Sequence, residues 1–155
     1  MTDNERKIIN YAITRYLAAR EHSRHELLRK LTLKEHDLEL SLQQIDKFSA
    51  ANIQSDARFA ESLVRGRINK GFGELFIRGR LSEHKIAQDL VNQAIENCVT
   101  ELQIDWYELA CKVLAKKYRD TPAKDWLDKQ KRSRFLQYRG FDHEQIRYAN
   151  QKRGN

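Results

Sequence analysis

One segment of the chain repeats an earlier one, and this repeat constrains the fold more than any other feature of the sequence. Residues 81–90 (LSEHKIAQDL) align without a gap on residues 33–42 (LKEHDLELSL), at an offset of 48 residues. The same offset continues upstream, where it places Gly71 on Ser23. A period of about 20 to 50 residues is typical of proteins built from small stacked units. The chain is therefore predicted to be an array of units that stretches out, rather than one compact domain.

Composition favours helices over strands. The 155 residues include only six glycines and one proline, which leaves little material for the tight turns of a β-sheet protein. No apolar run approaches the length of a membrane-spanning helix, and the N-terminus lacks the pattern of a signal peptide. We expect an all-α, cytoplasmic protein.

Helix-start signals divide the chain into three units of three helices, at residues 1–54, 55–98 and 99–155. The third unit aligns on the second at an offset of 60, because Ile146 matches Ile86, and so contains an insertion of about 12 residues. Residues 149–155 are predicted to fray, since they have nothing to bury. The expected helix starts, beyond that of the first helix, are Ser23 and Thr32 in the first unit, Ser55 or Asp56, then Gly71 and Ser82 in the second, and Thr121-Pro122 and Asp142 in the third.

The residue types needed for catalysis or metal binding are not found together. Residues 66–71 (GRINKG) have the glycine spacing of a phosphate-binding loop, but Phe72 and Gly73 stand where that loop needs Lys and Ser or Thr. The five histidines contain no His-Glu-x-x-His, and Cys98 and Cys111 lack Cys-x-x-Cys spacing. We therefore expect no enzyme activity, cofactor, metal ion or disulfide.

Two basic clusters are the candidate binding sites. The net charge is +7, and the excess is concentrated in residues 99–155, where 13 Lys or Arg face 8 Asp or Glu. Such a segment predicts contact with nucleic acid or an acidic protein surface, although an ordinary solvated cationic face is the alternative. The candidate residues are Arg65, Arg67, Lys70, Arg78 and Arg80 around the Gly71 turn, and Lys129, Lys131, Arg132, Arg134 and Arg139 in the third unit.

Three short motifs, taken in order, resemble the signatures of the RecX family. They are residues 17–27 (LAAREHSRHEL), residues 55–60 (SDARFA) with 70–73 (KGFG), and residues 135–141 (FLQYRGF). The resemblance covers nearly the whole chain. It departs from the family pattern at Glu74, where proline is common.

The resemblance implies both a shape and a role. The shape is an elongated, curved array of three tandem three-helix repeats, which we expect to be a monomer. The role is that of a non-enzymatic regulator in DNA repair and the SOS response. It would bind the RecA recombinase and its DNA filament, and DNA more weakly, through the two basic clusters. It would inhibit the ATPase, strand-exchange and coprotease activities of RecA, either by capping filament growth or by lying in the filament groove.

Two other classes of function stay open. Three-helix units joined by tight turns are also helix-turn-helix scaffolds, so a free-standing DNA-binding protein is the alternative, although the first two units are not strongly basic. An enzyme acting on nucleic acid is the third possibility, for which no cluster of acids or metal ligands is visible.

Overall fold

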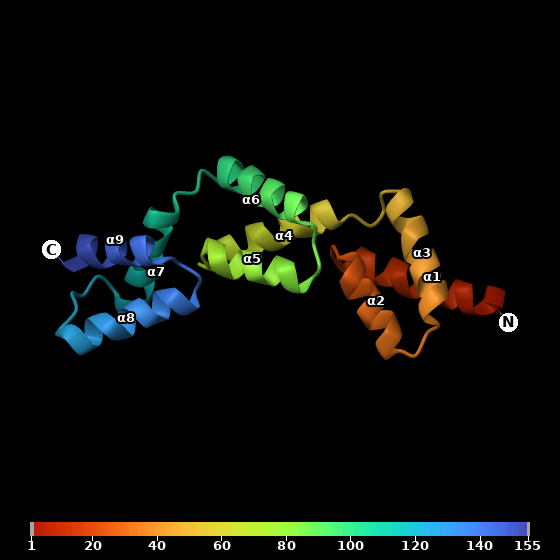
Figure 1. Ribbon diagram of the computed structural model, residues 1–155, viewed down its shortest axis with the longest axis horizontal. Helices are drawn as coiled ribbons and strands as arrows, with labels where there is room; N and C mark the ends of the chain where they lie inside the picture. Colours follow the sequence, from red (N-terminus) through yellow and green to blue (C-terminus); the bar gives the residue numbers. More distant parts are fainter. Residues whose placement is uncertain (1, 155) are drawn as a thin grey trace.

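The computed structural model describes residues 2–154, and over that range all of the regular structure is helical. Within these residues, nine helices form three bundles of three, which confirms the predicted all-α array. Figure 1 shows the bundles in an elongated, gently arched row with the two termini at opposite ends. The helices are α1 (Thr2–Ala19), α2 (Arg24–Leu33) and α3 (Leu38–Ala50) in the first unit, α4 (Asp56–Asn69), α5 (Glu74–Glu83) and α6 (Gln88–Leu102) in the second, and α7 (Trp106–Tyr118), α8 (Trp126–Tyr138) and α9 (His143–Gly154) in the third.

Polar caps start several helices where the sequence predicts them. The Ser23 hydroxyl accepts a hydrogen bond from the Glu26 N–H at 3.0 Å, and Ser55 caps α4 in the same way. At the start of α9 the Asp142 carboxylate accepts from the Gln145 N–H at 2.8 Å, while the Gln145 side chain accepts from the Asp142 N–H at 3.0 Å. This reciprocal pair is a capping box, and it satisfies two N–H groups that a helix end leaves unpaired.

Four other predicted helix starts are wrong. Thr32 lies inside α2, where its hydroxyl donates to the Leu28 carbonyl at 2.8 Å instead of capping a new helix. The sequence signal misled because serine and threonine can form this bond within a helix as easily as they cap one. The observed caps are Asp37 for α3 in place of Thr32, Gly73 for α5 in place of Gly71, Ala87 for α6 in place of Ser82, and Asp125 for α8 in place of Pro122.

The units are related by offsets of 50 and 55 residues, and the predicted offsets of 48 and 60 are wrong. Leu31, Leu81 and Leu136 occupy one equivalent position, and all three are fully buried. By contrast, Leu33, which the offset of 48 pairs with Leu81, is 73% exposed. The left-handed residue after the middle helix of each unit follows the same register, at Glu35, Lys85 and Gly140. Burial, and not the identity of exposed residues, therefore defines the repeat.

Each unit has its own hydrophobic core. The first core is built around Ile9 and Ile13, the second around Val64 and Ile77, and the third around residues that include Leu114 and Leu136. Leu109 of α7 packs against both the second and the third core. The short one-sided helices are thus stabilised mainly by packing within their own unit.

The C-terminal region is more ordered than the sequence predicts. Helix α9 continues to Gly154, and Ala149 is fully buried in the third core, so the prediction that fraying begins at Ala149 is wrong. Asn150 is also held, because its side-chain amide donates to the Ser133 hydroxyl at 2.9 Å. Asn155, the last residue of the predicted tail, lies outside the described residues. The expected unit boundary between residues 98 and 99 falls within α6.

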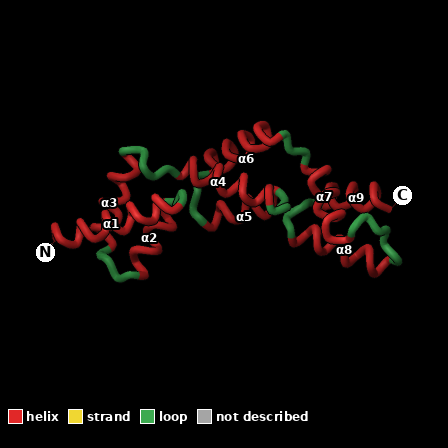
Figure 2. The backbone as a smooth tube through the Cα atoms, turned by 180° about the vertical axis from the view of Figure 1, so that it is seen from behind, coloured by secondary structure: helices red, strands yellow, loops and turns green. Residues whose placement is uncertain are grey.

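The middle helices of the three units lie end to end along the molecule, and we call this row α8–α5–α2 the spine. Figures 1 and 2 show the C-terminal end of α8 meeting the start of α5, and the end of α5 meeting the start of α2. At the first meeting, the N–H groups of Gly73 and Leu75 donate to the carbonyls of Arg139 and Gly140 at 2.7 and 3.1 Å. Donors that the start of α5 leaves unpaired thus pair with acceptors at the end of α8. The helix dipoles also run head to tail there, which is favourable.

The second meeting point of the spine uses side chains. Ser23, the cap of α2, lies 3.1 Å from Nδ1 of His84, which follows α5. The backbone N–H of Arg24 donates to the Asp56 carboxylate at 2.9 Å, and Nε of Arg58 donates to the Glu21 carboxylate at 3.0 Å. The first and second units are therefore joined by polar contacts.

Candidate nucleic-acid interface

Most of the basic residues that the sequence predicts as a binding site in the second unit interact with other residues of that unit. Three of them form ion pairs, and the hydrogen bond with Glu101 raises the pKa of Arg65. Exposed pairs of this kind contribute little to stability, but they reduce the net field that a phosphate would meet. The pairs are Arg65–Glu101 at 3.0 Å, Arg78–Glu74 at 2.7 Å and Arg80–Glu83 at 3.0 Å.

Arg67, a fourth member of that cluster, lies over aromatic rings. Its guanidinium carbon is 5.5 Å from the centre of the Phe72 ring and 5.8 Å from that of Phe76, and the two rings stack on each other at 4.2 Å. A guanidinium in this position is attracted to the face of a ring. Arg67 therefore helps to hold the turn between α4 and α5. Lys70 is then the exposed member of the cluster that forms no ion pair with any described residue.

Arg132 is a structural residue, and its expected place on a free basic surface is wrong. It occupies the position equivalent to the buried Leu27 and Ile77, and it is only 4% exposed. Its guanidinium donates to the Thr121 carbonyl at 2.6 Å and lies 4.4 Å from the centre of the Tyr118 ring. An ion pair with Asp128 at 3.4 Å completes its surroundings. Because the insertion before α8 lies over this position, the arginine ties that loop to the helix instead of facing solvent.

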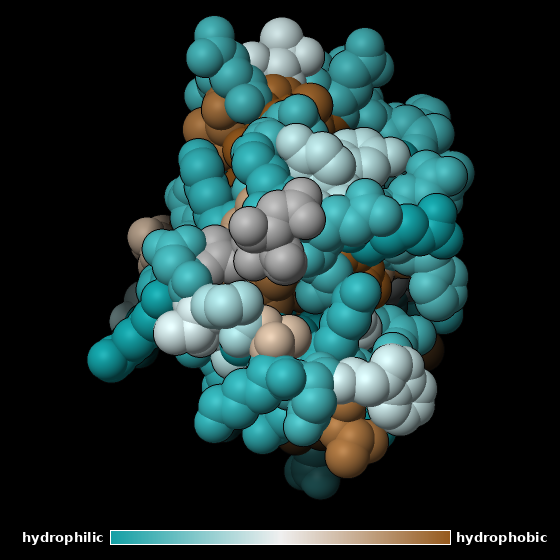
Figure 3. Space-filling view, turned by 90° about the vertical axis from the view of Figure 1, so that its left-hand side faces the viewer, coloured by the Kyte–Doolittle hydropathy of each residue, from teal (hydrophilic) through white to brown (hydrophobic). Residues whose placement is uncertain are grey.

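The other basic residues nominated on α8 face outward. Lys129, Lys131 and Arg134 are exposed, and none of them forms an ion pair within the described residues. Lys129 and Arg134 line a groove of about 330 Å³ between α8 and α9, which we call the α8–α9 groove, together with Arg147 and no acidic side chain. Figure 3 views the molecule from this end and shows a largely hydrophilic surface with a few separated hydrophobic residues.

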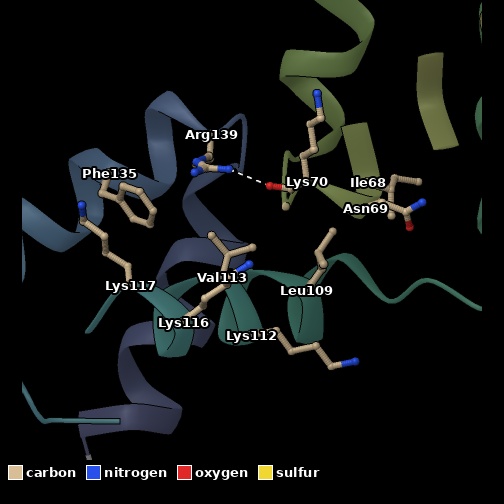
Figure 4. Close-up of a pocket in the computed structure, with 11 residues that line it drawn as sticks. Ile68, Asn69, Lys70, Leu109, Lys112, Val113, Lys116, Lys117, Phe135 and Arg139 are labelled. Carbon is tan, nitrogen blue, oxygen red and sulfur yellow. Dashed lines mark hydrogen bonds between the residues drawn. The ribbon is translucent and has the colours of Figure 1, made fainter. Parts of the chain in front are cut away.

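Arg139 and Lys70, which the sequence assigns to separate clusters, meet where the second and third units join. Nη1 of Arg139 donates to the Lys70 carbonyl at 2.8 Å (Figure 4). The same guanidinium lies 4.7 Å from the Phe72 ring centre and 5.4 Å from that of Phe135. One arginine thus fixes the end of α8 against the turn that precedes α5.

A cavity of about 360 Å³ opens beside this contact, and we call it the joint cavity. Figure 4 shows it between α7, the end of α8 and the end of α4. Its basic lining residues are Lys70 and Arg139 with three lysines of α7, and its lining contains no Asp or Glu. The three lysines were not nominated from the sequence, although the spacing of two of them by four places them on one helix face. They are Lys112, Lys116 and Lys117.

Two further features bear on the class of protein. Within residues 2–154, no helix combines the length and apolar character that crossing a bilayer requires. The same part of the chain contains no group of three or more His, Cys, Asp or Glu that could hold a metal ion. Cys98 and Cys111 are buried, and burial raises the pKa of the Cys98 thiol.

Comparison with known proteins decides the family. The model of the second three-helix domain of RecX matches residues 55–95, and that of the third three-helix domain matches residues 103–149. The regulatory protein RecX of Chromohalobacter salexigens is 39% identical over 135 residues, which cover 87% of this chain and 86% of that protein. This chain belongs to the RecX family.

Other RecX proteins show the same similarity. The regulatory protein RecX of Vibrio cholerae is 40% identical over 133 residues, which cover 86% of this chain and 85% of that protein. The fold matches the crystal structure of RecX from Lactobacillus salivarius, with a TM-score of 0.74 at 22% identity, over 97% of both chains. A second crystal structure of regulatory protein RecX matches with a TM-score of 0.77 at 23% identity, over 97% of this chain and 73% of that one.

The motifs that carry the RecX resemblance lie largely at the two meeting points of the spine. Ser23 of the first motif meets His84, and residues 70–73 meet residues 139–141. Glu74, which stands where the RecX pattern commonly has proline, is the first residue of α5, a position that tolerates proline without loss of a helical hydrogen bond. These motifs therefore describe how the units are joined.

Proposed function

We propose that this RecX-family chain is a non-enzymatic regulator that binds RecA and the RecA–DNA filament. It inhibits the ATPase, strand-exchange and coprotease activities of RecA, and it acts in the cytoplasm. The family assignment supports this role, and the shape of the molecule is compatible with it. An elongated row of three rigid units can contact several protomers of a helical filament at once.

The observation that carries the proposal is the uneven distribution of unpaired positive charge. In the second unit, Arg65, Arg78 and Arg80 are paired with carboxylates. In the third unit, the α8–α9 groove and the joint cavity have basic linings without acids. In the first unit, a cavity beside α1 is also lined by basic residues, but one of them, Arg20, is paired with Glu26. This charge distribution favours binding of DNA phosphates at the C-terminal end of the molecule and of protein along the rest. A RecA–DNA filament offers both kinds of surface.

The two proposed modes of inhibition differ in stoichiometry. Lying in the filament groove requires many copies along each filament, whereas capping requires about one copy for each growing end. The elongated shape favours binding in the groove, because only there can all three units contact RecA protomers at the same time.

The test is the RecA ATPase on single-stranded DNA, measured as this protein is titrated from well below the RecA concentration up to the RecA concentration. We expect inhibition, and we expect it to weaken when Lys129→Glu and Arg134→Glu are combined. The matched control, Lys7→Glu with Arg15→Glu in α1, reverses the same number of charges in the first unit, away from the α8–α9 groove and the joint cavity, and should inhibit nearly as well as the unchanged protein.

A free-standing DNA-binding protein is the competing function, favoured by the basic α8–α9 groove. Such a protein would inhibit an unrelated ATPase that depends on single-stranded DNA as strongly as it inhibits RecA. Equal inhibition of both ATPases, at equal DNA concentration, would contradict the RecA-specific proposal.

A further inference from the structure

We propose that the joint cavity binds one nucleoside phosphate unit of a DNA strand, and that its occupation clamps the second unit against the third. The inference deepens the proposed function, because it names a site, a ligand class and a consequence for the shape of the molecule. It is nevertheless tested without RecA, so its failure is distinguishable from failure of the regulatory role.

The charge of the lining selects an anion. Five cationic side chains and no carboxylate line a cavity of about 360 Å³. Side chains around a space of this size lie within roughly one Debye length, ~8 Å at physiological salt, of an anion placed in it. Lys70, Lys112 and Lys116 are exposed and form no ion pair within the described residues, and Glu108, the carboxylate that interacts with Lys112, is itself paired with Lys152 at 2.9 Å.

The apolar floor of the cavity favours a phosphate that carries an organic group over inorganic phosphate. Ile68, Leu109, Val113 and Phe135 line it between the cations, as Figure 4 shows. Apolar walls with a few polar groups at the rim are typical of sites for small organic ligands, which occupy roughly 300–1,000 Å³. A sugar or base packs on such a floor while its phosphate reaches the rim, as it does in proteins that bind single strands.

The cationic side chains come from two units, so a bound anion affects how these units are joined. Lys70 follows α4 in the second unit. Lys112, Lys116 and Lys117 lie on α7 in the third unit, where Arg139 follows α8. Without an anion, positive charges of both units lie around the joint, and their mutual repulsion opposes its closure. A phosphate between them removes that repulsion and binds only when the units are together, so occupation stabilises the closed joint by linkage.

Arg139 connects the ligand to the spine. Its Nη1 donates to the Lys70 carbonyl at 2.8 Å, and its own carbonyl accepts from the Gly73 N–H at 2.7 Å. A ligand that holds this guanidinium therefore holds the hydrogen bonds between α8 and α5 as well. The amides of Gly73 and Leu75, which donate across the joint, report directly on the clamp.

The experiment measures amide hydrogen exchange of the full chain with and without a single-stranded oligothymidylate. We expect slower exchange at Gly73 and Leu75, and no comparable change at Ile77, whose amide bonds within the second unit to Gly73. Lys112→Glu combined with Lys116→Glu should abolish this protection. The double variant should also bind the oligothymidylate roughly tenfold more weakly, with a salt slope lower by ~0.7 for each phosphate that it no longer neutralises.

Two controls separate a site from general electrostatics. Lys7→Glu with Arg15→Glu makes the same charge change in α1 and should leave the protection intact. Asn69→Trp adds bulk to the lining without changing the charge, and it should reduce the protection if a ligand enters the cavity. Protection that both charge-reversal pairs reduce equally, or that Asn69→Trp leaves untouched, would overturn the inference.

The source of the phosphate is decided by a second probe. Thymidine monophosphate and inorganic phosphate are compared with the oligothymidylate at equal phosphate concentration. Stronger protection by the oligothymidylate supports a strand as the ligand. Equal or stronger protection by the free nucleotide would overturn the assignment to a strand and make the cavity a site for a soluble nucleotide.

Discussion

Gly73 lies so close to Gly140 that a Cβ atom on Gly73 would stand 2.5 Å from the Gly140 carbonyl oxygen. In the other direction, a Cβ atom on Gly140 would stand 2.5 Å from the backbone nitrogen of Phe76. Rotation of a side chain relieves neither clash, because both involve backbone atoms. Gly140 also has a φ of +98°, which residues with a side chain rarely adopt. The end of α8 can meet the start of α5 only because both positions lack a side chain.

The first prediction concerns this close approach. Gly73→Ala should lower the free energy of unfolding by about 1–3 kcal/mol, because the added methyl group forces α5 and α8 apart. Gly79→Ala is the matched control, since it lies inside α5 with nothing within 4 Å of its Cβ position. There alanine should raise the free energy of unfolding by about 0.5–1 kcal/mol. Urea denaturation measures both, and a Gly73→Ala variant as stable as the unchanged protein would disprove the clash.

The second prediction separates the buried arginine from its exposed neighbours. Arg132→Ala should cost about 1–3 kcal/mol of stability, because it leaves carbonyl acceptors of the loop before α8 without their donor. Lys131→Ala, which changes an exposed side chain, should stay within about 0.5 kcal/mol of the unchanged protein. Arg132→Met should be less destabilising than Arg132→Ala, since this position is apolar in the other two units. Thermal and urea unfolding of the three variants provide the measurement, and equal costs for Lys131→Ala and Arg132→Ala would refute a structural role.

The third prediction concerns salt. Reversing Lys129, Lys131 and Arg134 to Glu should flatten the dependence of DNA affinity on salt concentration, because each phosphate that is no longer neutralised removes ~0.9 from the log–log slope on duplex DNA. Helicity measured by circular dichroism should stay unchanged, since all three side chains are exposed. An unaltered slope in a folded variant would show that this face of α8 is ordinary solvated surface.

The fourth prediction concerns pH. Burial lowers the pKa of His22 and of His84, which lie at the polar joint between the first and second units. A histidine whose pKa is lower in the folded state favours the neutral form. It destabilises the fold when pH falls below the unfolded value of about 6.5. The charged groups near both rings, which include Arg20 and Glu26 and, near His22, Lys30, are of both signs. Desolvation is therefore the main cause of the lowered pKa values.

The melting temperature should therefore hold steady above pH ~6.5 and decline as the pH falls from there through the lowered pKa values of the folded state. In His84→Gln the decline should be shallower, because one of the two groups no longer titrates. Differential scanning calorimetry between pH 8 and pH 5 tests this. A melting temperature that rises on acidification below pH 6.5 would contradict the prediction.

The fifth prediction concerns shape in solution. A monomer with three units in a row should give a radius of gyration clearly above the ~15 Å expected for a compact domain of this length. Small-angle scattering measures this value together with the molecular mass. A radius at the compact figure would mean that the units fold back on one another.

The fold class and the number of units could be predicted from the sequence, but the register of the repeat could not. The matching residues Leu33 and Leu81 suggested an offset of 48, yet one is exposed and the other is fully buried. Identity alone does not distinguish a chance match at the surface from a shared core position. The buried pair Leu27 and Ile77 gives the correct offset of 50, and it differs in residue type because a core selects for volume and polarity.

The candidate site was less accessible to sequence reasoning. Charge spacing along a helix predicts which residues share a face, but not which of them face a neighbouring element. Arg132 sits in the basic run of α8, and only the packing of the preceding loop shows that it is enclosed. The joint cavity could not be predicted, because Lys70, Lys112 and Arg139 are far apart in the sequence and meet only in the folded chain.

The joint between the second and third units is partly apolar, whereas the joint between the first and second units is polar, and this difference determines which units unfold together. Leu109 packs against two cores at once, so melting of the third unit removes part of the packing of the second. The partly buried residues that pack on the first core all lie within the first unit, and its link to the second runs through polar groups such as Ser23 and His84. Three architectural units should thus behave as two cooperative blocks, one of three helices and one of six, with the weak seam lying between α3 and α4.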